Sequence, residues 1–232
     1  MVVISGWGRG GDLAAPLTRE YATHRIGTTG TSALELRRYA RLIDLLDNVS
    51  FRSPSGPRQP LTDAVVVGRI VSTSMGRAFD DGEDGGTVAE PSTEVPWDDP
   101  RSDWKTVHLI VEVDEVISGS APGQIMVGLS LGAATDDRVV RAGLSRMGTL
   151  LLFLQHGRSP VFDYDRSVFA DVEGGRLIAL LDDRGRITLP MLQSDLAESL
   201  REGAHTLDEL RAAATGPRRE VLVNEFGEPG SL

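Results

Sequence analysis

Carboxylates that crowd into one short stretch are the residues of this chain best suited to chemistry. Residues 80–103 contain nine Asp and Glu residues and a single basic residue, Arg101. The densest part, DDGED at residues 80–84, invites a calcium interpretation because Ca²⁺ binds several carboxylate oxygens. The EF-hand pattern needs acids at alternate positions, and Gly82 breaks that alternation. We therefore interpret the stretch as a solvated loop and expect neither a metal ion nor another cofactor.

The same stretch is a candidate contact surface for a partner protein. Two tryptophans lie at its C-terminal end, and tryptophan is enriched among the residues that dominate binding energy. These tryptophans could instead pin the acidic loop to the rest of the fold, and both interpretations stay open. The candidate contact residues are four carboxylates and the two tryptophans, namely Asp80, Asp81, Glu83, Asp84, Trp97 and Trp104.

The other reactive groups form no recognisable catalytic pattern. The four histidines are dispersed along the chain, and no Gly-x-Ser-x-Gly motif is present to position a serine nucleophile. The absence of cysteine excludes disulfides, thiolate metal sites and thiol catalysis. We therefore expect a non-enzymatic protein-binding or structural module. A hydrolase or metal-dependent enzyme, with a site assembled from several loops, is the alternative.

The charge distribution disfavours nucleic-acid binding. The net charge is −10, and residues 80–103 alone contribute −8, nine acids against one arginine. Residues 1–62 carry eight arginines against five acids, or +3. Nucleic-acid binding normally needs a basic stripe, and aromatic residues, at 5% of the chain, are few for base stacking. Lys105 is the single lysine among 24 basic residues, which we interpret as the coding bias of a GC-rich bacterial or phage genome.

Apolar runs in the middle of the chain predict the strands that must position these groups. Runs of strand length occupy residues 64–71, 107–116, 125–129 and 150–155, and two shorter ones lie at 177–181 and 187–189 around a turn. The first run is continuously apolar, which predicts burial on both faces, and Gly68 at its centre predicts a bulge or tight bend. The second run alternates, which places His108 on the exposed face.

The flanking segments predict helices. Residues 1–62 read as an irregular arm, an amphipathic helix over 32–46 and a proline-rich linker over 48–61. The helix is expected to cover the β domain, with a partner protein as the alternative. Residues 191–232 predict a helix at 195–201, a second one capped by Thr206 and Glu209, and a tail. Between them, 63–190 form the β domain, with an acidic insertion at 76–103 that we expect to lack regular structure.

The β domain resembles an OB-type five-stranded barrel and, more narrowly, bacterial domains of the class similar to tissue inhibitors of metalloproteinases. The resemblance rests on DAVVVGRIV at 63–71, VEVDEVISG at 111–119 and MGTLLLFL at 147–154. It implies a mainly β fold, a small OB-like barrel with flanking N-terminal and C-terminal helices, and a binding role. Eukaryotic inhibitors of that class chelate zinc through an N-terminal cysteine, which this chain lacks, so inhibition by that route does not carry over. An immunoglobulin-like sandwich is the alternative fold.

Neither a secretion signal nor a membrane span is indicated by the sequence. The apolar start of the chain ends after four residues, where a signal peptide needs a longer run. No apolar run reaches the 18 residues typical of a membrane-spanning helix. We therefore expect a cytoplasmic protein with a protein partner and no membrane association.

Overall fold

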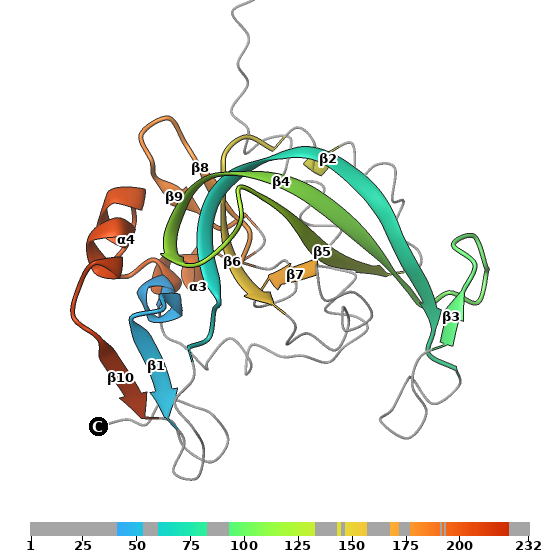
Figure 1. Cartoon of the computed structure of the whole chain (residues 1–232), viewed down its shortest axis with the longest axis horizontal. Helices are drawn as coiled ribbons and strands as arrows, with labels where there is room; N and C mark the ends of the chain where they lie inside the picture. Colours follow the sequence, from blue (N-terminus) through green and yellow to red (C-terminus); the bar gives the residue numbers. More distant parts are fainter. Residues whose placement is uncertain are drawn as a thin grey trace, which may run out of the picture.

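The computed structural model describes residues 41–52, 60–82, 93–132, 143–144, 147–156, 168–171, 177–190, 192 and 194–222. Within these residues the protein is mainly β, as predicted, with two α-helices and a 3₁₀ helix (Figure 1). The elements in chain order are η2 (Leu42–Leu45, the 3₁₀ helix), β1 (Val49–Arg52), β2 (Ala64–Asp80), β3 (Thr93–Val95), β4 (Trp104–Gly119), β5 (Gln124–Gly132), β6 (Leu150–His156), β7 (Val168–Asp171), β8 (Ala179–Leu181), β9 (Ile187–Thr188), α3 (Ser194–Leu200), α4 (Leu207–Ala214) and β10 (Arg219–Leu222).

Five strands of the larger sheet form a ring. β2 pairs with β4, β4 with β5, β5 with β7 and β7 with β6, and β6 returns to pair with β2. Among these five pairings, β5 with β7 alone is parallel. β3 extends the sheet beyond β2, while β8 and β9 extend it beyond β6. The ring therefore occupies the middle of the sheet, and β3 lies at one far end of it (Figure 1).

β2 pairs along both of its edges at its start, and Gly68 lies where the pairing with β6 ends. Residues 64–68 of β2 pair with β6 along one edge, while the whole strand pairs with β4 along the other. The register to β4 shifts between Val67 and Gly68, where the sequence predicted a bulge or tight bend, and the extra residue, Asp114, lies in β4. A Cβ atom at Gly68 would collide with the carbonyl oxygen of Glu112 and lie 2.9 Å from Cγ1 of Val111. The backbones can approach this closely only because the residue is glycine.

Two apolar clusters form the core on either side of β2. One draws side chains from all five ring strands, including Val66, Leu109 and Val127, and we infer that it fills the ring. The other combines Val65 and Phe153 with residues of η2, β1, α3 and α4. Because successive strand residues point to opposite faces, Val65 and Val66 enter different clusters. The start of β2 is thus buried on both faces, as predicted, whereas residues 69–71 are exposed or only partly buried.

β2 extends nine residues beyond the predicted 64–71, to Asp80. Residues 72–77, STSMGR, are mostly polar and largely exposed, so apolar burial does not account for their extended shape. They pair with β4, which satisfies backbone hydrogen bonds without a buried face. The expectation that 76–103 lacks regular structure is wrong for the described residues, because the end of β2 and all of β3 lie there. Residues 83–92 lie outside the described residues.

His108 is buried, contrary to its predicted place on the exposed face of β4. Gly76 of β2 lies beside it, and a Cβ atom at Gly76 would approach the histidine Nε2 to 3.0 Å. The missing side chain at Gly76 therefore leaves the space that the imidazole occupies. Alternation along β4 could not predict this, because the space is made by the neighbouring strand.

The chain segments that precede and follow the larger sheet in the sequence pair with each other. β1 pairs in parallel with β10, so part of the predicted linker at 48–61 is a strand, and the linker prediction is wrong there. The described end of the helix predicted over 32–46 is the 3₁₀ helix η2, and residues 32–40 lie outside the described residues. The two predicted C-terminal helices are confirmed as α3 and α4, with the Thr206 and Glu209 capping box in place. No helix of the described residues is long and apolar enough to cross a membrane.

The close approach at Gly68 generates a stability prediction. Gly68→Ala should lower the free energy of unfolding by about 3 kcal/mol, because the added methyl meets backbone atoms that cannot move aside. Gly123→Ala is the matched control: nothing lies within 4 Å of its Cβ position, and we expect a change of at most about 0.5 kcal/mol. Urea denaturation of both variants measures the difference. Equal stability of the two would contradict the bulge geometry.

Candidate functional site at the end of the β2–β4 arm

Beyond Gly68 the larger sheet continues as a projecting arm. We define the arm as β2 from Arg69 to Asp80, β3, the turn 96–103 and the start of β4 from Trp104 to Ile110. β5 pairs with β4 along this part, as far as Trp104 opposite Gly132, so a third strand supports the arm. Figure 1 shows the arm ending at β3, on the opposite side of the molecule from α4, β1 and β10.

Trp104 fixes the end of the arm. Its ring stacks on Phe79 of β2, with ring centroids 4.1 Å apart and an interplanar angle of 16°. Its Nε1–H donates to Oδ1 of Asp81 at 2.7 Å. The backbone N–H of Asp81 in turn donates to Oδ2 of Asp103 at 2.8 Å, and the Asp103 N–H donates to the Phe79 carbonyl. The carboxylates just after β2 are therefore held to the start of β4.

The turn between β3 and β4 is held by Asp99 and Arg101. The Asp99 carboxylate accepts from Nε of Arg101 at 3.1 Å, from its Nη2 at 2.8 Å and from its backbone N–H at 2.9 Å. These hydrogen bonds from Arg101 lower the pKa of Asp99 to about 2. In the same turn Trp97 is partly buried, and Nζ of Lys105 lies 5.2 Å from the centroid of its ring.

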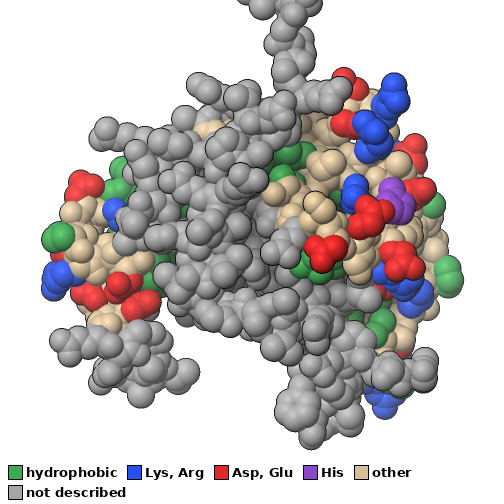
Figure 2. Space-filling model, turned by 180° about the vertical axis from the view of Figure 1, so that it is seen from behind, with side chains coloured by type: hydrophobic (Ala, Val, Ile, Leu, Met, Phe, Trp, Pro, Cys, Tyr) green, Lys and Arg blue, Asp and Glu red, His purple; other side chains and the backbone are tan. Residues whose placement is uncertain are grey.

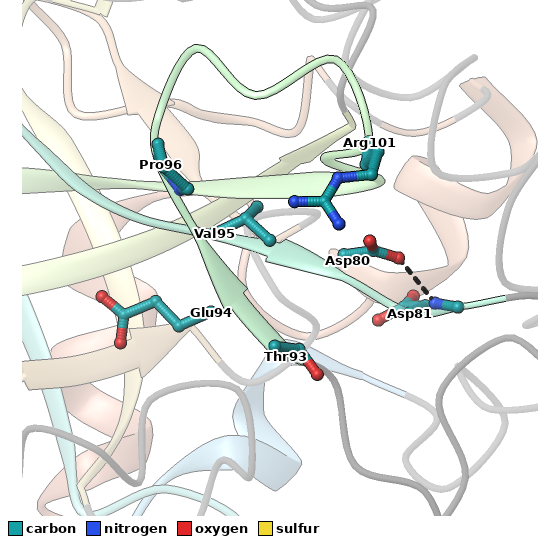
Figure 3. Close-up of a pocket in the computed structure, with 8 residues that line it drawn as sticks. Asp80, Asp81, Thr93, Glu94, Val95, Pro96 and Arg101 are labelled. Carbon is teal, nitrogen blue, oxygen red and sulfur yellow. Dashed lines mark hydrogen bonds between the residues drawn. The ribbon is translucent and has the colours of Figure 1, made fainter.

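A pocket of about 360 Å³ lies between β3 and the end of β2. Figure 3 shows Arg101 reaching toward Asp80 across it, with Val95 and Pro96 on the β3 side. Asp80 accepts from the Gly82 N–H at 2.8 Å, while Glu94 accepts from Nη1 of Arg77 at 2.7 Å. The residues that line the pocket are Asp80, Asp81, Gly82, Thr93, Glu94, Val95, Pro96 and Arg101.

The surface of the arm is predominantly acidic. Its described residues from 77 to 105 carry six carboxylates, at positions 80, 81, 94, 98, 99 and 103, against Arg77, Arg101 and Lys105. The two arginines are engaged by Glu94 and Asp99 within the arm itself. Figure 2 shows acidic side chains on the arm, at the left of that view. Such a surface attracts cationic groups and repels phosphates.

The structure brings together three of the residues singled out from the sequence, Asp80, Asp81 and Trp104. Trp97 lies apart from them in the turn, packed against the core cluster of the ring. Trp104 pins the arm through Phe79 and Asp81, which supports the anchoring interpretation of the tryptophans. Glu83 and Asp84 lie outside the described residues.

Sequence reasoning missed the β3 side of the pocket. The strand β3 is too short for a period-2 pattern to emerge. Only its two β-branched residues, Thr93 and Val95, hinted at a strand. The role of Arg101 had one signal, its position as the lone cation in an acidic stretch. Phe79 had none, because its stacking partner lies 25 residues further along the chain.

The described residues do not assemble catalytic groups at the pocket. The described histidines lie on separate elements: His108 in β4, His156 at the end of β6 and His205 before α4. The pocket lining contains no histidine, and its one hydroxyl belongs to Thr93. No cluster of three or more metal-ligating side chains occurs among the described residues. The pocket thus offers binding groups, carboxylates beside apolar Val95 and Pro96, rather than a nucleophile with its base.

Comparisons with protein-family models, with curated proteins and with solved structures found no match to this chain.

The Trp104 contacts generate a prediction about the arm. Trp104→Phe keeps an aromatic ring on Phe79 but removes the hydrogen bond to Asp81, and should lower the free energy of unfolding by about 1 kcal/mol. Trp104→Ala also removes the stack and should cost about 2 kcal/mol. Urea denaturation monitored by circular dichroism measures both. If the two variants match the unmodified protein, these contacts do not hold the arm.

The Asp99–Arg101 pair generates a prediction about pH. The folded pKa of about 2 lies below the ordinary value of 3.8, so the pair stabilises the turn above about pH 4. That stabilisation is lost as the pH falls from about 4 through about 2, where Asp99 takes up a proton. Carboxyl ¹³C NMR should show Asp99 titrating near 2, and nearer 3.8 in Arg101→Gln. Titration near 3.8 in the unmodified chain would refute the pairing.

Proposed function

We propose that this chain is a non-enzymatic protein-binding module, in which an OB-type barrel carries the arm as its contact surface. The observation that carries the proposal is the construction of the arm tip. There, Trp104 and Asp103 hold Asp81, and the Gly82 N–H donates to the Asp80 carboxylate, beside a pocket that lies away from the helices. A pre-formed acidic surface loses little conformational entropy on binding, which favours association with a cationic partner.

The order of the ring strands supports an OB-type barrel. Numbered along the chain, the five ring strands pair in the order 1-2-3-5-4-1, with the parallel pair between the third and the fifth. This is the order of the five-stranded Greek-key barrel of the OB class. The register shift beside Gly68, where Asp114 is the extra residue of β4, is the kind of irregularity that such a small barrel needs to bend sharply. The proposal also includes the narrower resemblance of the β domain to bacterial domains of the class similar to tissue inhibitors of metalloproteinases.

The enzyme and nucleic-acid alternatives find less support. An enzyme would gather carboxylates and histidines into one pocket, whereas the described histidines lie on separate elements. A nucleic-acid-binding barrel would present basic and aromatic side chains, whereas the arm presents carboxylates. We therefore propose a protein partner with a basic surface.

A charge comparison tests the proposal. In Asp80→Asn/Glu94→Gln/Asp98→Asn the arm loses three charges, while amide oxygens remain to accept the hydrogen bonds from Gly82 and Arg77. Affinity capture from the native cell should recover a partner with the unmodified chain, and at least tenfold less of it with the variant. Raising the salt concentration should weaken capture in the same way.

The matched control removes exposed carboxylates far from the arm. Asp183 lies in the β8–β9 turn and Glu202 follows α3, and both are exposed. Asp183→Asn/Glu202→Gln should capture the partner as the unmodified chain does. Equal capture by the arm variant and this control would overturn the arm as contact surface. Turnover of a small molecule by the purified chain would overturn the non-enzymatic assignment.

A further inference from the structure

Part of β2 presents an open backbone edge in the arm. β6 pairs with β2 only as far as Gly68, and β3 begins to pair with it at Ala78. Between these points, over residues 69–77, β2 has no strand neighbour on the side away from β4 among the residues that the structure describes; within this stretch β4 pairs with it as far as Met75. We call Arg69–Met75 the open edge. At about 3.3 Å per residue it spans about 20 Å, the length of an ordinary strand.

The open edge also carries exposed apolar side chains. Val71 is 51% exposed and Met75 53%, and they belong to a group of only four large apolar residues exposed in the described chain. The residues between them, STS at 72–74, are small and leave the backbone accessible. Natural sheets usually protect such an edge with charges, proline or a covering element, because unpaired N–H and C=O groups attract another strand. In this chain Arg69 is the one charged residue of the open edge.

The open edge leads directly to the acidic pocket. Three residues after the open edge, Ala78 pairs with Val95, and Val95 and Pro96 line the pocket together with Asp80 and Glu94. A strand added along the edge would therefore end beside these carboxylates. A cationic side chain at that end would meet three carboxylates, those of Asp80, Asp81 and Glu94, against the one cation Arg101 in the pocket lining. Backbone hydrogen bonds would hold the rest of the strand.

We propose that the partner binds as an extended segment that adds a strand to the open edge and places a lysine or arginine side chain in the pocket. This inference rests on the proposed protein-binding function and names the kind of segment that is bound. A second copy of the chain fits less well, because each copy carries a net charge of −10 and would set its own acidic surface against another.

Peptide selection on the full-length chain tests the inference. The probe is a library of random 12-residue peptides displayed on phage, with no assumption about the natural partner. Selected peptides should alternate β-branched residues with others and contain arginine or lysine toward one end. On binding of a selected peptide, amide exchange should slow at least tenfold for those N–H groups of Val71–Met75 that face the edge. Methylating alternate backbone nitrogens of the peptide should weaken binding at least tenfold, and this arm of the test needs no protein variant.

Edge variants provide the second measurement. Val71→Lys/Met75→Lys places charges on the open edge at exposed positions and should weaken the selected peptides at least tenfold. The control, Val116→Lys/Leu222→Lys, alters exposed apolar residues outside the open edge and should change affinity less than twofold. Equal binding by the two variants, or failure to select any peptide, would overturn the inference. So would a dimer of the unmodified chain that Val71→Lys/Met75→Lys dissociates, since the edge would then join two copies.

The outcomes separate this inference from the proposed function. If the arm-charge variant loses its cellular partner while Val71→Lys/Met75→Lys retains it, the partner uses the acidic tip without adding a strand. The inference then fails and the protein-binding function stands. If neither variant loses the partner, both fail.

Discussion

The antiparallel pairing of β2 with β4 is the constraint on which the rest of this structure depends. It runs from Ala64 opposite Gly119 to Phe79 opposite Trp104, and its register shifts at four places. Bulges bend strands and increase their twist, so one long pairing can change direction along its length. The part before Gly68 belongs to the ring, and the part after it forms the arm. A close backbone approach at Gly68 lies at the junction of the two.

The ring and the arm are stabilised in different ways. The ring buries an apolar cluster drawn from its five strands, and a second cluster attaches η2, β1, α3 and α4 to β2 and β6. Val107 and Leu109 of the arm are buried in the cluster of the ring, whereas the end of the arm is held by backbone pairing, by the Phe79–Trp104 stack and by hydrogen bonds of Asp81 and Asp103. Binding surfaces commonly lie on such segments, because a stable scaffold leaves their side chains available for a partner.

The sequence predicted the parts of the fold that burial determines. Apolar periodicity located the first half of β2, the centres of β4, β5 and β6, the turn between β8 and β9, and both C-terminal helices. It missed the end of β2, where Ser72–Ser74 stay extended through pairing with β4 rather than through burial. It also missed β1, whose parallel partner β10 lies far along the chain.

The candidate site was predictable in its charge and not in its shape. Asp80, Asp81 and Trp104 could be singled out by residue type and clustering. The stack of Trp104 on Phe79 and the pocket beside Thr93–Val95 depend on how two strands and a turn meet. The same holds for buried His108, whose space is created by Gly76 on the neighbouring strand. Contacts between residues distant in sequence leave no local pattern to read.

The most direct test of the central claim, that the arm is a rigid continuation of the ring, compares amide hydrogen exchange in the arm part of β4 with exchange in the ring. Trp104 and Lys105 lie near the end of the arm between β2 and β5, whereas Val66 and Leu152 lie in the ring. If one continuous pairing holds both parts, the β4 amides of the arm should be protected to within about tenfold of those in the ring. Arm amides that exchange as fast as an unstructured chain, while ring amides stay protected, would contradict the account.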